Sequence, residues 1–227
     1  MGLDESSLFL VLAEDLKTPL TRIAYKTEQA TSDRQAIADI QHITRHTLDL
    51  LDAYTLGAHG QTELPLEPVN PSAVMVDTLH DLTDYATRFD CELRMCTPAR
   101  HASVLIHRPS LQAALSAIAK VFIETQDQAH HKDKFIEIAS YATSKGCAVG
   151  IFCAGDATLQ RQLLSRARAN AGSVLRPFAG LASGMSVQLF IAEQLMDRMQ
   201  TGLRTARRGE LSGLAIDLIR SNQLQLI

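Results

Sequence analysis

An apolar stripe at helical spacing runs through the N-terminal part of the chain and constrains its fold more than any other feature. Large aliphatic residues recur there at intervals of three or four positions: Leu8, Leu12, Leu16, Leu20 and Ile23. This period predicts an amphipathic helix. A similar repeat predicts a second helix, which follows a capping cluster at residues 31–33 and ends near Gly57. Because a two-helix hairpin cannot enclose its own apolar stripe, residues 5–58 are expected to dimerise into a four-helix bundle.

A proline interrupts the first of these helices within its apolar stripe. Pro19 lacks a backbone N–H, so the helix should kink next to Asp15 and Thr18. Glu14 and Lys17 fall on polar faces of the same segment. A kinked helix that exposes an acid and a hydroxyl one turn apart can present chemistry to a partner. The simpler interpretation is a solvated polar face.

The composition favours proteins as partners. The 227 residues are 46% hydrophobic and carry a formal net charge of -3. There is no basic block to neutralise phosphates, so nucleic acid is not an expected partner. The apolar runs are shorter than the ~20 residues that span a bilayer, and the first residues lack the basic segment of a signal peptide. A cytoplasmic protein that does not enter a membrane is therefore expected.

The chain shows no pattern of metal ligands. His42 and His46 lie one turn apart on the second predicted helix, but the sequence supplies no nearby acid or third ligand, so they are interpreted as surface or bundle histidines. The cysteines lie in apolar or alternating segments and never form a Cys-x-x-Cys pair. They are therefore predicted to be reduced core thiols. The cysteines are Cys91, Cys96, Cys147 and Cys153.

The rest of the chain alternates helical and strand-like patterns. Prolines at positions 65, 68 and 71 predict a stiff connector, which places a domain boundary between residues 1–62 and 63–227. Gly146 is expected to supply an unusual dihedral angle in a hairpin turn. Helices alternating with mixed strands make an α+β sandwich. The predicted order is a helix from Asn70, strands at 91–96 and 103–106, a helix from 108 to about 125, strands at 135–142 and 147–153, a polar stretch at 158–170, a helix after 184, and strands at 203–207 and 213–219.

The segment from Glu14 to Leu20 resembles the phosphoacceptor segment of two-component sensor histidine kinases, which reads His, Glu or Asp, hydrophobic, Arg or Lys, Thr or Asn, Pro, Leu. Asp15, Leu16, Lys17, Thr18, Pro19 and Leu20 all fit this pattern, whereas Glu14 stands in the place of the phosphorylated His. The order of elements is also similar to that family's core, a helical dimerisation domain followed by an ATP-binding domain of the Bergerat type. Further landmarks are His107 to Leu111, Arg176 to Phe178, Ser183 to Val187, and Gly209 to Gly213.

The residues that carry the family's chemistry have changed. Kinase activity in this family needs a His nucleophile, an Asn that holds magnesium, an Asp for the adenine amine, and glycines that let backbone amides approach the phosphates. Besides Glu14, the helix after Ser110 contains no Asn, and Lys120 and Val121 stand about where one belongs. The resemblance therefore implies that ATP and magnesium binding are lost and that no cofactor is expected.

The glycine boxes are also reduced. The Asp-x-Gly-x-Gly box has become residues 152–157, where Gly155 remains and Asp156 is displaced, and of the second box only Gly184 remains. A side chain in place of a glycine blocks the approach of a phosphate. The simpler interpretation is that Gly155, Gly184 and Gly213 serve turns.

Three classes of function follow from the resemblance. The favoured one is a catalytically inactive, histidine kinase-like signalling protein that dimerises and binds a regulatory partner, receiver-like, through Glu14 to Pro19. The second is a phosphatase toward a phosphorylated response regulator, in which Asp15 and Thr18 orient a water molecule. The third is an active histidine kinase or phosphotransferase with divergent motifs, against which the altered boxes count.

Overall fold

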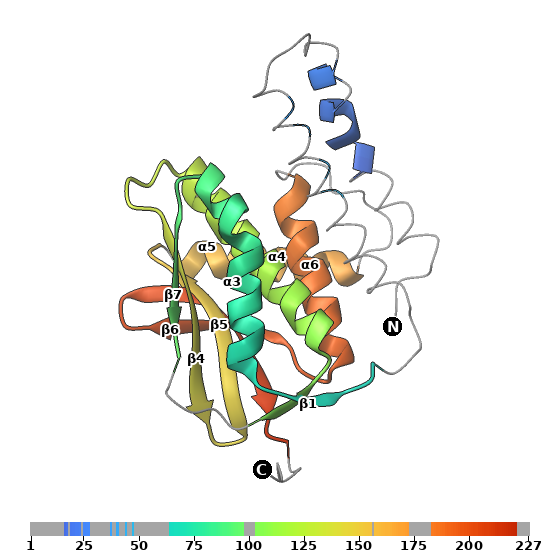
Figure 1. Ribbon diagram of the computed structural model, residues 1–227, viewed down its shortest axis with the longest axis vertical. Coiled ribbons are helices and arrows are strands. Elements are labelled where there is room, and N and C mark those ends of the chain that lie inside the picture. Colours follow the sequence, from blue (N-terminus) through green and yellow to red (C-terminus); the bar gives the residue numbers. More distant parts are fainter. Residues whose placement is uncertain are drawn as a thin grey trace.

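The computed structural model describes residues 16–17, 19–23, 25–27, 37, 40, 44, 47, 64–97, 103–155, 157–172 and 183–221. In this part of the chain, helices pack against one face of a strongly twisted mixed sheet (Figure 1). The elements follow one another as β1, α3, β2, β3, α4, β4, β5, α5, α6, β6 and β7. This mixture of helices and strands confirms the predicted α+β class.

The helices α3 (Pro71–Arg88) and α4 (Arg108–Gln128) begin where the sequence signals predicted. The side chain of Asn70 accepts a hydrogen bond from the N–H of Ser72 at 3.0 Å, and Pro71 follows as the first helical residue. Pro109 lies in the first turn of α4, and the helix runs slightly beyond the predicted end near residue 125. Arg108 pairs with Asp77, which joins the two helices.

The main sheet has the strand order β2 (Glu92–Cys96), β4 (Phe135–Thr143), β5 (Gly146–Cys153), β7 (Leu211–Ile219) and β6 (Leu203–Arg208). The pair β2–β4 is parallel and the other pairs are antiparallel. The predicted β4–β5 hairpin is therefore confirmed, and β6 and β7, at the positions of the last two predicted strands, form a second hairpin. The tip of the second hairpin reaches back toward β2, since Arg208 donates to Glu137 of β4 at 2.6 Å and to Cys96 of β2 at 2.7 Å.

One short strand lies where a connector was predicted. β1 (Glu67–Val69) pairs antiparallel with β3 (Val104–Ile106), and Pro68 lies opposite Leu105. The interpretation of this segment as only a proline-stiffened connector was wrong. Proline is tolerated because β1 is an edge strand of a two-stranded sheet.

The helical layer is completed by α5 (Ala157–Gly172) and α6 (Ser183–Arg198). The sequence predicted α6, whereas α5 lies where only polar composition was noted. Arg168 of α5 donates to Glu193 of α6 at 2.8 Å and so ties the two helices together. The buried residues of α5 stand at helical spacing: Gln160, Leu163, Leu164 and Ala167.

Gly146 is required for a reason other than the predicted one. Among the described glycines, a positive φ occurs at Gly155 and at Gly209, which has φ of 56° in the β6–β7 turn. Gly146 lies at the start of β5, where an added Cβ would come within 2.2 Å of the backbone oxygen of Leu218 in β7. The close approach of two strands therefore excludes a side chain there.

The core lies between the helices and the inner face of the sheet. Its largest members are fully buried: Met75, Leu82, Leu115, Ile118, Phe122, Ile138 and Ile151. Cys91, Cys147 and Cys153 are buried free thiols, as predicted, whereas Cys96 is half-buried. No helix in the described part of the chain is long and apolar enough to cross a membrane.

Candidate functional site

The described residues of the phosphoacceptor-like segment are helical. Leu16 and Pro19 are half-buried, and Lys17 is exposed. The hydroxyl of Thr21 donates to the backbone oxygen of Lys17 at 2.7 Å, one turn earlier. The predicted site residues Glu14, Asp15 and Thr18 lie outside the described residues, so their roles remain predictions.

The residual glycine box lies at the end of β5. Gly155 has φ of +157°, which side chains rarely adopt, and no atom lies within 4 Å of an added Cβ. A glycine at position 155 is therefore explained by its backbone dihedral angle, which agrees with the simpler interpretation that this glycine serves a turn. In an Asp-x-Gly-x-Gly box, the Asp stands two positions before the first glycine. With Gly155 as that glycine, the acidic position is occupied by Cys153, the last residue of β5. Asp156 lies outside the described residues.

The turn interpretation was wrong for the other two glycines. Gly184 lies in the first turn of α6. Gly213 lies within β7, where an added Cβ would come within 2.0 Å of the backbone oxygen of Ile151. Both positions are parts of regular elements.

A buried glutamine organises the end of β5. Gln160, which is 5% exposed, donates its side-chain amide Nε2 to the backbone oxygen of Ser212 at 2.9 Å and toward Cys153 Sγ at 3.6 Å. Ser212 in turn donates its hydroxyl to the backbone oxygen of Gly155 at 2.9 Å. These bonds join α5, β5 and β7. The sequence analysis missed Gln160, although the spacing of Gln160, Leu163 and Ala167 could have placed it on the buried face of a helix.

Burial keeps the Cys153 thiol neutral. It raises the pKa of Cys153 to about 11, against a smaller opposing effect of the hydrogen bond from Gln160. A family box would hold an ionised carboxylate at this position. The chain instead holds an uncharged, weakly accepting sulfur atom.

In α4, the helix that would carry a magnesium-binding Asn, the residues near that position make other contacts. Val121 is fully buried, and Lys120 points toward α3, with its Nζ 5.6 Å from the centroid of the Tyr85 ring. Glu124 accepts a hydrogen bond from the Tyr85 hydroxyl at 2.5 Å. Among the described residues, no group of three His, Cys, Asp or Glu side chains could hold a metal ion.

Burial is the largest influence on the pKa values of Glu124 and Tyr85. It raises the pKa of Glu124, although the hydrogen bond from Tyr85 and the charges of Lys120 and Arg22 act in the opposite direction. The pKa of Tyr85 is also raised, first by burial and then by the Glu124 charge. Of the first predicted helix, Arg22 is thus close enough to Glu124 for its charge to act on this carboxyl group.

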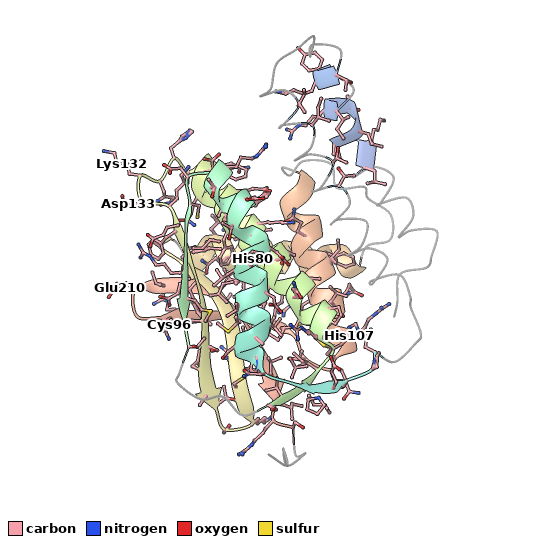
Figure 2. The ribbon with its side chains drawn as sticks, in the orientation of Figure 1. His80, Cys96, His107, Lys132, Asp133 and Glu210 are labelled. Atoms are coloured by element: carbon pink, nitrogen blue, oxygen red, sulfur yellow. The ribbon has the colours of Figure 1, made fainter. Side chains whose placement is uncertain are left out.

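Other polar groups belong to the frame of the fold. Figure 2 shows His107 at the N-terminal end of α4, where its Nδ1 lies 2.8 Å from the hydroxyl oxygen of buried Ser110. Cys96 lies at the same edge of the molecule as Glu210, at the tip of the β6–β7 hairpin (Figure 2). These contacts fix element ends and the hairpin.

No protein-family model matches the chain, and no curated protein matches it. Solved structures do match this chain. The histidine kinase AdeS of Acinetobacter baumannii is 15% identical over 92% of this chain and 98% of its own, with a TM-score of 0.58. Full-length ShkA, solved in complex with AMPPNP, is 12% identical over 95% of this chain and 46% of its own, with a TM-score of 0.59.

A third structure, the histidine kinase ThkA in complex with the response regulator protein TrrA, is 13% identical over 96% of this chain and 62% of its own, with a TM-score of 0.56. The chain thus spans less than half of ShkA and less than two thirds of ThkA. At sequence identities this low, the similarity to these structures is evidence of the fold alone. The chain has the fold of the sensor histidine kinase core.

Proposed function

We propose that this chain is a histidine kinase-like signalling protein without kinase activity, which dimerises through its N-terminal helices and binds a receiver-like regulatory protein. The observation that carries the proposal is the end of β5, where a buried neutral thiol stands at the acidic position of the box and the Gln160 amide lies against it. An uncharged thiol cannot replace a carboxylate as acceptor for a charged or strongly polar ligand group.

Loss of nucleotide binding is the first expected result. Calorimetric titration of ATP with magnesium should give a dissociation constant weaker than roughly 0.1 mM, equivalent to about -5.5 kcal/mol. The physical reasons are the thiol at Cys153, the buried aliphatic side chain of Val121 and the helical position of Gly184. Tighter binding would mean that another residue, such as Asp156, replaces the lost acid.

Dimerisation is supported by apolar side chains that the described chain leaves in water. Leu20, Tyr25 and Ile37 are 55%, 60% and 50% exposed. Burial of a large aliphatic side chain is worth about 1.5–3 kcal/mol, so a partner surface that covers them would be strongly favoured. A second copy of the same hairpin offers such a surface.

Replacing both Leu20 and Ile37 with Asp should convert the dimer into a monomer. Loss of two such contacts predicts a dimer dissociation constant raised by about 100-fold or more. Light scattering across a concentration series measures it. Val76→Asp on α3 is the matched control, because Val76 is also 50% exposed. A wild-type protein that stays monomeric at micromolar concentration contradicts the proposal.

The partner surface is proposed to be the helix from Glu14 to Pro19, and the ThkA structure shows a protein of this fold in complex with a response regulator. Leu16→Arg and Glu14→Arg should weaken binding of purified receiver domains by about tenfold or more, since each removes a complementary contact. Surface plasmon resonance measures the affinity. Lys132→Glu, an exposed charge reversal on another loop, should change nothing.

The phosphatase remains the second candidate because Asp15 and Thr18 stand three positions apart in the sequence, which is the spacing of one turn in the helix that their segment is predicted to form. In that case Thr18→Ala abolishes receiver dephosphorylation and leaves the dimer intact. Unchanged turnover in that variant excludes this mechanism.

A further inference from the structure

We propose that the β6–β7 hairpin, residues 203–219, is a strap that closes the outer face of the main sheet and opens as a unit, with two arginine side chains as its fasteners. The outer face is the one turned away from the helices. The inference goes beyond the proposed function, because it concerns neither the N-terminal helices nor nucleotide binding.

The strand register identifies the residues of the outer face. Ile151 and Leu214 belong to the core that the helices cover, so Phe152, which follows Ile151 in β5, points the other way. Residues directly opposite one another on paired strands share a face of the sheet. Phe152 lies opposite Glu137 of β4 and Gly213 of β7, which places all three residues on the outer face.

Two arginines of β6 reach across this face to β4. Arg208 donates to Glu137 Oε1 at 2.6 Å, and Arg204 donates to the hydroxyl oxygen of Tyr141 at 3.0 Å. Arg204 also donates to the two carboxylate oxygens of Asp217 in β7, at 2.7 and 2.8 Å. The two arginines stand four positions apart in β6, and their acceptors stand four positions apart in β4. The contacts therefore form two antiparallel bridges between these strands.

The bridges require the sheet to curl. In the strand order, β7 and β5 lie between β6 and β4. With strands about 4.8 Å apart, a flat sheet would hold β6 roughly 14 Å from β4 and roughly 19 Å from β2. Arg208 nevertheless donates to Cys96 Sγ of β2 at 2.7 Å. The outer face is therefore concave, and the tip of the strap lies on the same side of the molecule as β2 (Figure 1).

The concave face encloses an apolar side chain that a single layer of sheet would leave in water. Phe152 is fully buried, although it points away from the helices. An added Cβ would come within 2.9 Å of its ring at Gly150 and within 2.7 Å at Gly213, so the ring lies against small neighbours. The other buried residues of this face are also small: Ala139, Ala148 and Ala215. Opening of the strap exposes Phe152 as the centre of an apolar surface.

The fasteners are weaker than the contacts of the core on the inner face. The side chain of Arg208 is 34% exposed and that of Arg204 is 41% exposed, so water and salt screen both bridges. The hydrophobic contacts of the inner face are not screened in this way. The strap therefore opens at a lower free energy than the whole domain unfolds, and high ionic strength favours the opening.

Labelling of Cys96 with iodoacetamide, an uncharged reagent, measures the opening. Cys96 is half-buried and its Sγ is in contact with Arg208. The other thiols are buried, and their pKa values are raised to about 11, so they react only when the domain unfolds. They are Cys91, Cys147 and Cys153.

Arg204→Gln breaks the bridge that does not touch the thiol. Labelling of Cys96, located by mass spectrometry, should become about fivefold to tenfold faster, because the loss of one fastener increases the population of the open strap. Arg207→Gln is the matched control. It removes the same charge from the same strand, but Arg207 is exposed and its side chain points to the opposite side from those of Arg208 and Ala206. Its labelling rate should equal that of wild type.

Glu137→Gln is the second variant, since it weakens the other bridge and keeps the Arg208 side chain. It should accelerate labelling by a similar factor, and the factors should multiply in the double variant, because both bridges hold one strap. About 1 M NaCl should accelerate labelling of wild type more than that of the double variant. A wild-type rate in Arg204→Gln, or an equal acceleration in Arg207→Gln, overturns the inference. Acceleration of Cys147 in step with Cys96 would mean global unfolding and also overturns it.

Discussion

Gly213→Ala should lower the free energy of unfolding by about 3 kcal/mol or more, because an added methyl group meets backbone closer there than at any other described glycine. The added Cβ would come within 2.0 Å of the backbone oxygen of Ile151 and within 2.7 Å of the Phe152 ring. The first of these atoms is backbone in the neighbouring strand β5, so no change of side-chain rotamer relieves the contact. The central pair β5–β7 would have to separate.

Urea unfolding followed by circular dichroism measures this effect. Gly202→Ala is the matched control, because the nearest atom to an added Cβ there is Glu193 Oε1 at 4.0 Å. That variant should stay within about 0.5 kcal/mol of wild type. If Gly213→Ala were as stable as Gly202→Ala, the tight approach of β5 and β7 would be wrong.

The sequence predicted those elements that depend on residues close together along the chain. The start of α3 follows from Asn70 and Pro71, which cap and begin the helix whatever its tertiary contacts. The β6–β7 turn follows from Gly209, whose φ of 56° favours a glycine. By contrast, β1 exists because β3 pairs with it, and a strand of this length carries no pattern of its own. The parallel pairing of β2 with β4 is also a property of the assembled sheet.

The candidate site was predictable only in part, for the same reason. The family pattern located Gly155 and the loss of an Asn near Lys120. The role of Gln160 depends on Ser212, which lies 52 positions further along the chain. Gly146 and Gly213 were recognised as glycines but given turn roles, because a close approach between β5 and β7 has no signature in either segment alone.

Tyr85→Phe should destabilise the domain by about 1.5–3 kcal/mol at neutral pH, since it removes the hydroxyl that donates to the half-buried carboxylate of Glu124. The ring remains, so the contact with Lys120 is kept. The loss should depend on pH. Burial raises the pKa of Glu124 above its ordinary value, so the folded state binds the proton more tightly than the unfolded state does. The stability from this group is complete below the ordinary glutamate pKa of about 4.3 and is lost as pH rises through the folded pKa.

Without the Tyr85 hydroxyl, which lowers that pKa, the loss of stability with rising pH should be larger than in wild type. Urea unfolding at a series of pH values from about 5 to 8 measures the two slopes. Glu124→Gln is the control, because a glutamine oxygen still accepts from Tyr85 and does not titrate, so its slope over this range should be smaller than that of wild type. Parallel curves for Tyr85→Phe and wild type would show that the hydroxyl does not stabilise the ionised Glu124. A steeper curve for Tyr85→Phe, abolished by adding Glu124→Gln, would assign the pH dependence to the hydrogen-bonded pair of Tyr85 in α3 and Glu124 in α4.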